Sequence, residues 1–155
     1  MAKFPTEVER SVTVKVPLAQ VYRYLWDVVG SSPCIPGLDS CKSVGNDTYR
    51  FQFEERSTGP VSMTVRYTAR YDGNGKDRIT FEGTGAKGDN TDVTGSIRLQ
   101  TAGAGATKIV LQQTLAPDTP VPRLLQGFIR SYVEKEAGDA AKQYLANVKQ
   151  ALERG

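Results

Sequence analysis

One stretch decides the fold: residues 123–154 read RLLQGFIRSYVEKEAGDAAKQYLANVKQALER. Apolar side chains recur in it with the spacing of an α-helix, for example at Leu125, Ile129 and Val133. At a rise of about 1.5 Å per residue, one helix over this stretch is roughly 48 Å long. A domain of 155 residues has a radius of gyration of only about 15 Å. The stretch therefore predicts a long C-terminal helix that crosses the whole width of the domain.

The region before this helix has a different periodicity. Between residues 39 and 116 apolar and polar side chains alternate, as in 49–53 and 61–71, which is typical of strands with one buried face. The Pro-rich residues 116–122 are predicted to be a connection to the helix. The alternating runs are separated by segments typical of hairpin turns, at 45–47, 72–75, 87–90 and 102–105. These patterns predict an antiparallel meander of about six strands, whose apolar face another element must cover.

The N-terminal region predicts one more strand and two short helical segments. Val residues alternate with polar residues across 7–16, which indicates a strand. Apolar residues at helical spacing then predict a helix over 18–28, with Gly30 as its C-terminal stop. Residues 31–33 are predicted to open a single helical turn, which Pro36 and Gly37 close.

Combined, these patterns predict an α+β fold. An antiparallel sheet of about six to seven strands curves around the long C-terminal helix, and short helices follow the first strand. No repeat or charged linker divides the sequence, so residues 1–155 are predicted to form one domain. A domain of this length buries about 68–70% of its unfolded surface, which is enough for a full core.

Composition narrows the classes of function. Hydrophobic residues make up 39% and charged residues 24% of the chain, which indicates a folded protein. No apolar run approaches the roughly 18 residues of a membrane span, and no signal peptide is visible, so we expect a cytoplasmic protein. The net charge is +3, with the basic residues dispersed along the chain. A nucleic-acid-binding surface, which needs a basic patch, is therefore not predicted.

The chain contains no histidine and only two cysteines, Cys34 and Cys41. A Ser-His-Asp triad or a Cys-His pair is excluded, and a zinc site is not predicted. In the cytoplasm two free thiols are favoured over a disulfide, although the spacing allows either. We therefore predict no metal, no cofactor and no catalytic residue of these classes.

The element order and several short motifs resemble the START/SRPBCC superfamily. This superfamily has the helix-grip fold, which is shared by the birch pollen allergen and the polyketide cyclases. Within the superfamily, the sequence is most similar to the G-subunit family of carbon monoxide dehydrogenase. The motifs that carry the resemblance are Pro17-Leu18-Ala19-Gln20-Val21-Tyr22, Trp26-Asp27, Ile35-Pro36-Gly37, Gly59-Pro60-Val61, and the stretch from Gly83-Thr84-Gly85 to Gly95.

The resemblance implies a cavity between the long helix and the sheet that holds an apolar ligand. Inward-facing positions carry large, often aromatic side chains, as small-molecule pockets do. The alternative is that these side chains fill a closed core. The predicted ligand-binding residues are Trp26, Phe51, Phe53, Met63, Tyr67, Phe81, Leu111, Gln113, Leu115, Phe128 and Tyr132.

A few polar residues interrupt these apolar positions. Gln113 stands in an apolar strand face, where a buried amide needs hydrogen-bond partners from the protein, water or a ligand. Tyr67 and Tyr132 can present a hydroxyl to a ligand carbonyl or extend it to the rim. Glu136 lies on the helix stripe, and an exposed edge position is favoured over a buried carboxylate.

The sequence favours a carrier that binds a hydrophobic small molecule, such as a lipid, a quinone or a polyketide. One alternative is a cyclase or dehydratase that acts in the same cavity, with Tyr67, Tyr132, Glu136 or Gln113 polarising carbonyl groups. The absence of histidine counts against that enzyme. A second alternative, allowed by the resemblance to the carbon monoxide dehydrogenase family, is an accessory or assembly factor with a redox enzyme as its partner. No sequence feature predicts an oligomeric state.

Overall fold

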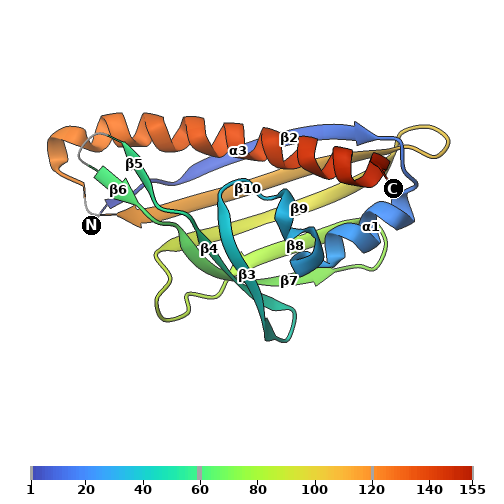
Figure 1. The fold of residues 1–155 in the computed structure, drawn as a ribbon, viewed down its shortest axis with the longest axis horizontal. Coiled ribbons are helices and arrows are strands. Elements are labelled where there is room, and N and C mark those ends of the chain that lie inside the picture. Colours follow the sequence, from blue (N-terminus) through green and yellow to red (C-terminus); the bar gives the residue numbers. More distant parts are fainter. Residues whose placement is uncertain (1, 59–60, 120, 155) are drawn as a thin grey trace.

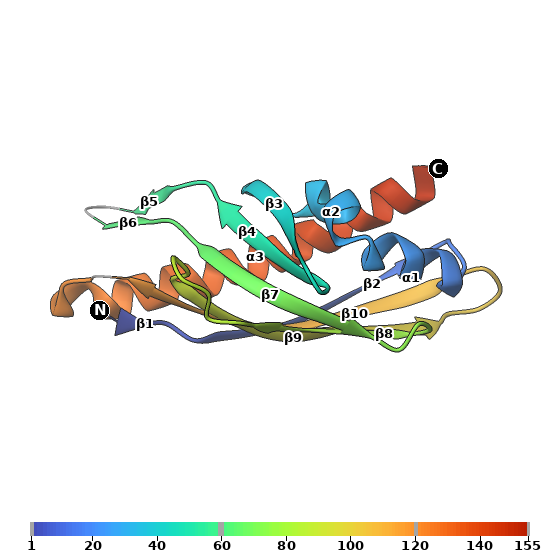
Figure 2. The ribbon, with the colours of Figure 1, turned by 90° about the horizontal axis from the view of Figure 1, so that it is seen from below.

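A long helix lies across one face of a curved antiparallel sheet (Figures 1 and 2). The computed structural model describes residues 2–58, 61–119 and 121–154. The elements in chain order are β1 (Ala2–Lys3), β2 (Thr6–Val14), α1 (Leu18–Trp26), α2 (Val28–Ser31), the 3-10 helix η1 (Ser32–Cys34), β3 (Leu38–Gly45), β4 (Thr48–Phe53), β5 (Arg56–Thr58), β6 (Val61–Met63), β7 (Arg66–Gly73), β8 (Arg78–Gly83), β9 (Thr91–Thr101), β10 (Thr107–Thr119), the 3-10 helix η2 (Arg123–Leu125) and α3 (Gln126–Arg154).

The main sheet is a meander closed by the first strand. Strands β3, β4, β7, β8, β9 and β10 pair with one another in that order, each antiparallel to the next. Strand β2 returns to the far edge and pairs with β10, with Val14 opposite Thr107 and Thr6 opposite Leu115. The predicted α+β helix-grip arrangement, with its meander and its long C-terminal helix, is confirmed.

The edge formed by β1 and β2 is broken opposite a proline. The Phe4 amide donates to the Pro117 carbonyl at 3.1 Å, but Pro117 has no N–H with which to return the bond. The Thr6 hydroxyl lies 3.4 Å from the Phe4 carbonyl and donates to it instead. Pro117 belongs to β10, so the prediction that residues 116–122 are all connection was wrong in its first half. Strand β10 can continue through Pro117, because the one N–H donor that the proline lacks would face this break in the β1–β2 edge.

The predicted hairpin turns lie between consecutive strands of the sheet. Asn46 and Asp47 both have a φ of 55°, which fits the tight turn that joins β3 to β4. In the next turn the Asn74 side-chain oxygen accepts from three backbone amides, those of Lys76, Asp77 and Arg78. The side chain thereby provides acceptors for the turn amides and fixes the start of β8 at Arg78.

Two element boundaries differ from the sequence predictions. The alternating run 61–71 forms two strands, because β6 pairs with β5 in a separate two-stranded sheet whereas β7 joins the main sheet. Gly30 lies inside α2 and does not end a helix. The carboxylate of Asp27 accepts from the Gly30 amide at 3.0 Å, so Asp27 separates α1 from α2 and caps the second helix.

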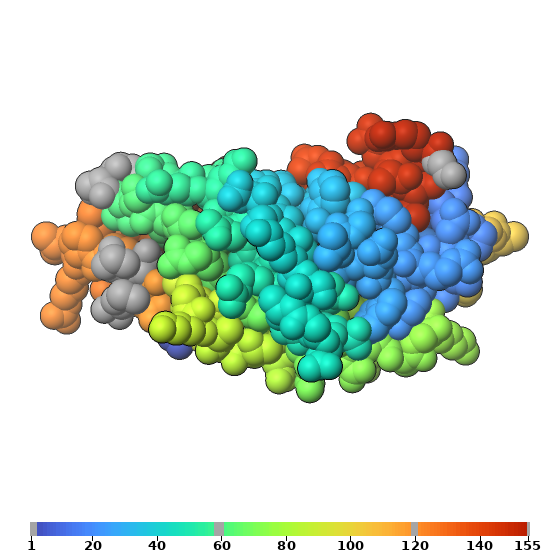
Figure 3. Space-filling model, turned by 60° about the horizontal axis from the view of Figure 1, so that its bottom comes forward, coloured from blue at the N-terminus to red at the C-terminus, as the bar shows by residue number. Residues whose placement is uncertain are grey.

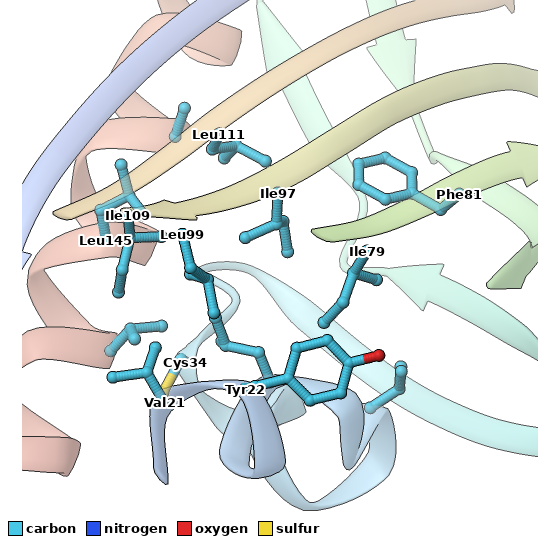
Figure 4. Close-up of a cluster of buried hydrophobic side chains, with 14 of the residues drawn as sticks. Val21, Tyr22, Cys34, Ile79, Phe81, Ile97, Leu99, Ile109, Leu111 and Leu145 are labelled. Atoms are coloured by element: carbon cyan, nitrogen blue, oxygen red, sulfur yellow. The ribbon is translucent and has the colours of Figure 1, made fainter. Parts of the chain in front are cut away.

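The main core fills the space between the sheet, α1 and the C-terminal half of α3 (Figure 4). Ile79, Ile109 and Val21 are almost completely buried there. Phe81 packs over Gly95 on the neighbouring strand, where a Cβ atom would lie 2.6 Å from the Phe81 ring. Gly95 therefore leaves the room that this ring needs, and the position of the ring bears on the site described below.

A second, smaller core lies under the first turns of α3. Phe4, Val61, Ile129 and Val133 are buried in it, and Met63, Val121 and Leu125 pack against them. This cluster fixes the N-terminal end of α3 to the small β5–β6 sheet and to the edge of β10.

Cys34 and Cys41 are free thiols in the structure. The hydroxyl of Tyr24 and the Sγ of Cys34 are 3.2 Å apart and share a hydrogen bond. Burial raises the pKa of the Cys41 thiol. Among the helices that the structure describes, none is long and apolar enough to cross a membrane.

Candidate functional site

A cavity with two adjoining compartments lies between α3 and the sheet. The outer compartment has a volume of about 150 Å³ and the inner one about 110 Å³. The two compartments adjoin, and five residues line both of them: Pro36, Phe53, Tyr67, Leu115 and Ala140.

An ion pair stands at the rim of the outer compartment. Nη1 of Arg56, at the start of β5, lies 3.3 Å from Oε2 of Glu136 on α3, and both side chains are about half exposed. A Cβ atom on Gly37 would lie 3.0 Å from the Arg56 guanidinium, so the arginine also covers the turn after η1. We call Gly37, Arg56 and Glu136 the cavity mouth. It joins three segments that are distant in the sequence.

The walls of the outer compartment behind the mouth are almost entirely apolar. Met63 and Val65 line it from the sheet side, and Tyr132, Val133 and Ala137 line it from α3. These helix residues follow from the 3.6-residue period, because positions 133 and 137 are one turn apart and both are buried.

The inner compartment contains a group of polar side chains in apolar surroundings. Tyr67 and Tyr71 reach it from β7, Gln113 from β10 and Tyr144 from α3. The hydroxyls of Tyr22 and Tyr24 are hydrogen-bonded elsewhere in the molecule. Among the side-chain hydrogen bonds of the described residues, none involves the hydroxyls of Tyr67, Tyr71 and Tyr144 or the Gln113 carboxamide. None of the four is a fully buried atom without a partner, so each keeps some surface open to the compartment. These four groups are free to bind a guest in the cavity.

Burial controls the protonation of the three phenols. It raises the pKa of Tyr67, Tyr71 and Tyr144 well above 10, the usual value for tyrosine, because a phenolate would lose its hydration in this compartment. Weaker electrostatic effects of neighbouring phenols and thiols act in the same direction. The three hydroxyls are therefore neutral hydrogen-bond donors throughout the physiological pH range.

Stacked rings hold two of these phenols in place. The rings of Phe51 and Tyr67 are 4.9 Å apart, and those of Tyr71 and Phe81 are 5.3 Å apart, both in stacked arrangements. Tyr49 meets Tyr71 edge to face at 5.6 Å. Such contacts restrict ring motion, so the hydroxyls of Tyr67 and Tyr71 are positioned before any guest arrives.

Most of the predicted ligand-binding residues line this cavity. The eight that do so are Phe53, Met63, Tyr67, Phe81, Leu111, Gln113, Leu115 and Tyr132. Glu136 lies at the mouth, partly exposed, as its position at the edge of the helix stripe predicted.

Three predicted residues lie elsewhere. Phe51 is completely buried and lies behind Tyr67, which it supports by stacking. Trp26 stacks on Tyr22 with ring centres 6.2 Å apart, away from the cavity lining. The inward placement of Phe128 was wrong, because this side chain is 57% exposed while its neighbour Ile129 is fully buried.

The sequence prediction missed Tyr71 and Tyr144 as lining residues. Tyr71 continues the alternation of Tyr67 on β7, and Tyr144 lies on the apolar stripe of α3, so both signals were present. Pro36 and Ala140 also line the cavity. The motif Ile35-Pro36-Gly37 is predicted as a turn at the cavity mouth, and Ala140 lies on the same helix stripe as Tyr144. A proline and an alanine line a cavity only where the neighbouring side chains leave space unfilled.

The comparisons with known proteins agree on one fold. A family model described as polyketide cyclase/dehydrase and lipid transport matches residues 5–153. A Thermus thermophilus protein matches with a TM-score of 0.72 and 19% identity, over 94% of this chain and 96% of its own. An aromatase/cyclase from Streptomyces sp. R1128 matches with a TM-score of 0.73 and 18% identity, over 97% and 94%. A START superfamily protein from Mycobacterium smegmatis matches with a TM-score of 0.73 and 12% identity, over 96% of this chain and 97% of its own. No curated protein matches the sequence significantly.

Proposed function

Because this chain belongs to the polyketide cyclase/dehydrase and lipid transport family, we propose that it binds a small hydrophobic molecule in the cavity under α3. The observation that carries the proposal is the inner compartment, where three phenol hydroxyls and one carboxamide face an otherwise apolar space. These groups keep surface open to the compartment, so a guest that enters it can form hydrogen bonds with them in place of water.

The volumes favour a compact ligand. An apolar cavity of about 150 Å³ holds a molecule of the size of benzene, and here a slightly smaller compartment adjoins one of that volume. Together they suit a molecule of about two rings, such as a quinone or a polyketide-like aromatic compound, better than a long acyl chain.

The polar groups favour a neutral ligand that carries oxygen. Phenol hydroxyls that stay protonated donate hydrogen bonds, so a carbonyl or hydroxyl oxygen of the ligand is their natural partner. Among the residues that the structure describes, none that lines the inner compartment is charged, and a charged ligand group there would be costly to bury. We therefore place the oxygen-bearing end of the ligand inside and its apolar body in the outer compartment.

A carrier role is favoured over catalysis by the state of the polar groups. The carboxylate of Glu136 is engaged by Arg56 at the mouth, and the buried phenols resist ionisation at neutral pH. A general base needs a pKa near the working pH, which the buried phenols of the inner compartment do not have.

A cyclase or dehydratase is the second candidate, and one observation favours it. Tyr67 and Gln113 line the inner compartment together, and Tyr67, Tyr132 and Glu136 line the outer one. Hydrogen-bond donors gathered in this way could polarise a carbonyl group. The resemblance to the carbon monoxide dehydrogenase family implies a third role, as an accessory factor beside a redox enzyme. This role would use the cavity only if the protein passed a bound ligand to that enzyme or received one from it.

The binding proposal is tested by native mass spectrometry of the purified protein, followed by titration with a naphthoquinone and with a C16 fatty acid. We expect one bound naphthoquinone per chain and weaker binding of the fatty acid. Ala140→Leu places a larger side chain where the compartments join and should weaken binding at least tenfold. The control Ala146→Leu makes the same change at another exposed alanine of α3, one that lines neither compartment, and should bind normally. Absence of binding to wild type, or equal loss in both variants, would refute the proposal.

A further inference from the structure

Two large apolar side chains are exposed together at one end of the molecule. Leu124 in η2 is 98% exposed and Phe128 in α3 is 57% exposed. The backbone stays helical at Gln126, which joins the two segments, so residues four apart lie on the same face. We call Leu124 and Phe128 the apolar tip. In Figure 3 the first turns of α3, in orange, form one end of the molecule beside the green β5–β6 hairpin.

The apolar tip is held on a rigid support. Leu125 and Ile129, which adjoin it in the sequence, face inward into the second core, where Ile129 is fully buried against its neighbours. The exposure of Leu124 and Phe128 is therefore a property of a folded, anchored helix end. An apolar pair that the fold presents in this way indicates an interaction site.

The charged residues of η2 and the first two turns of α3 have one sign. Arg123 and Arg130 flank it, and both are exposed. Neither η2 nor the first turn of α3 contains an acidic residue, and the first one along the helix is Glu134. Within the described residues, Arg123 and Arg130 form no ion pair. Basic side chains around exposed Leu and Phe are the composition of segments that lie at a membrane surface.

The apolar tip is continuous with the entrance of the cavity. Phe128, Tyr132 and Glu136 follow one another at intervals of four residues on α3, and the last two line the outer compartment. A side chain four residues further along a helix is a direct neighbour. The same helix thus leads from the exposed tip to the cavity mouth.

We propose that the apolar tip docks the protein on an anionic lipid bilayer, with Leu124 and Phe128 inserted among the lipids and Arg123 and Arg130 against the phosphates. A second copy of the chain fits the tip less well. A stable protein interface covers about 800 Å² on each partner, far more than two side chains provide. In a symmetric pair the arginines would also face each other.

The test is co-flotation of the ligand-free protein with vesicles of phosphatidylcholine and phosphatidylglycerol in a 3:1 ratio, and with vesicles of phosphatidylcholine alone. We expect the protein to float with the anionic vesicles and to be released by high salt. The double variant Leu124→Ser/Phe128→Ser should bind at least tenfold more weakly. Arg123→Gln/Arg130→Gln should lose about tenfold on the anionic vesicles only.

The matched control is Val29→Ser/Val44→Ser, which removes two exposed apolar side chains elsewhere on the surface. It should float like wild type, and all variants should show the same circular dichroism spectrum. The proposal is overturned if wild type does not float with anionic vesicles or if the control loses as much binding. It is also overturned if wild type is a dimer in sedimentation and the tip variant is a monomer. The test needs no cavity ligand, so its result is independent of the proposed function.

Discussion

The guanidinium of Arg56 and the carboxylate of Glu136 are 3.3 Å apart across the cavity mouth. They join β5, part of the small separate sheet, to the middle of α3. Because both side chains are about half exposed, water screens the pair, and such pairs contribute at most about 1 kcal/mol to stability. Its position therefore matters more for access to the cavity than for the stability of the fold.

We predict that Glu136→Gln speeds the exchange of a bound ligand severalfold and changes the free energy of unfolding by less than about 1 kcal/mol. The variant removes the charge that holds Arg56 over the mouth but keeps the size of the side chain. Stopped-flow measurement of naphthoquinone release and urea unfolding would check both parts. Asp139→Asn, which breaks the exposed pair between Lys135 and Asp139 on the same helix, should change neither. Equal release rates in wild type and Glu136→Gln would contradict the prediction.

The buried phenols predict a loss of stability at high pH. Burial raises the pKa of Tyr67, Tyr71 and Tyr144 in the folded protein, whereas in the unfolded chain it is about 10. Below pH 10 both states keep the phenol protons, so the contribution to stability is fully present. Above pH 10 only the unfolded chain releases them, and stability falls as pH rises, by up to about 1.4 kcal/mol per pH unit for each tyrosine.

Urea unfolding at pH 8, 10 and 11 measures this slope. The triple variant Tyr67→Phe/Tyr71→Phe/Tyr144→Phe should unfold with a clearly flatter dependence between pH 10 and 11, because the groups that titrate only in the unfolded chain are gone. A variant with the slope of wild type would show that other groups cause the alkaline loss.

Local sequence signals predicted the strands well because their causes are local. Alternation places Tyr49, Phe51 and Phe53 on one face whatever the rest of the chain does, and the turn at Asn46 and Asp47 needs only residues that tolerate a positive φ. The break in the run 61–71 was not predictable in this way. It depends on β6 finding its partner in β5, which no pattern within the run records.

The site was predictable in its composition but not in its shape. Phe128 was placed inward because a helix stripe read from spacing alone has an uncertain phase, and Ile129 next to it takes the buried position. The cavity exists because Pro36, Ala140 and the side chains of distant strands do not fill the space between α3 and the sheet. No single residue predicts this unfilled space, since the residues of a densely packed core would follow the same sequence pattern.

Two glycines predict opposite effects of the same substitution. Gly95→Ala should destabilise the protein by about 1–3 kcal/mol through overpacking, because a Cβ atom there would clash with the backbone carbonyl oxygen of Gln112 and would lie 2.6 Å from the Phe81 ring. It should also weaken ligand binding, since Phe81 lines the inner compartment. Gly127→Ala meets no atom within 4 Å and should stabilise α3 by about 0.5–1 kcal/mol. Thermal unfolding of the two variants measures both effects, and a neutral Gly95→Ala would show that both Phe81 and the β10 backbone at Gln112 can move aside.

Substitution of Gln113 tests whether its carboxamide binds the ligand or only supports the core. Gln113 is partly buried and lines the inner compartment, so Gln113→Leu should change the stability of the empty protein by no more than about 1 kcal/mol. The same change removes a hydrogen bond to an oxygen-bearing ligand, so naphthoquinone binding should weaken about tenfold while binding of naphthalene is kept or improved. Gln112→Leu changes the neighbouring residue, whose side chain lies toward the other face of β10, and should leave the binding of both compounds unchanged. If Gln113→Leu instead destabilised the protein and weakened both compounds equally, the amide would be a structural part of the core, and the oxygen-bearing end of the ligand would have to be placed elsewhere.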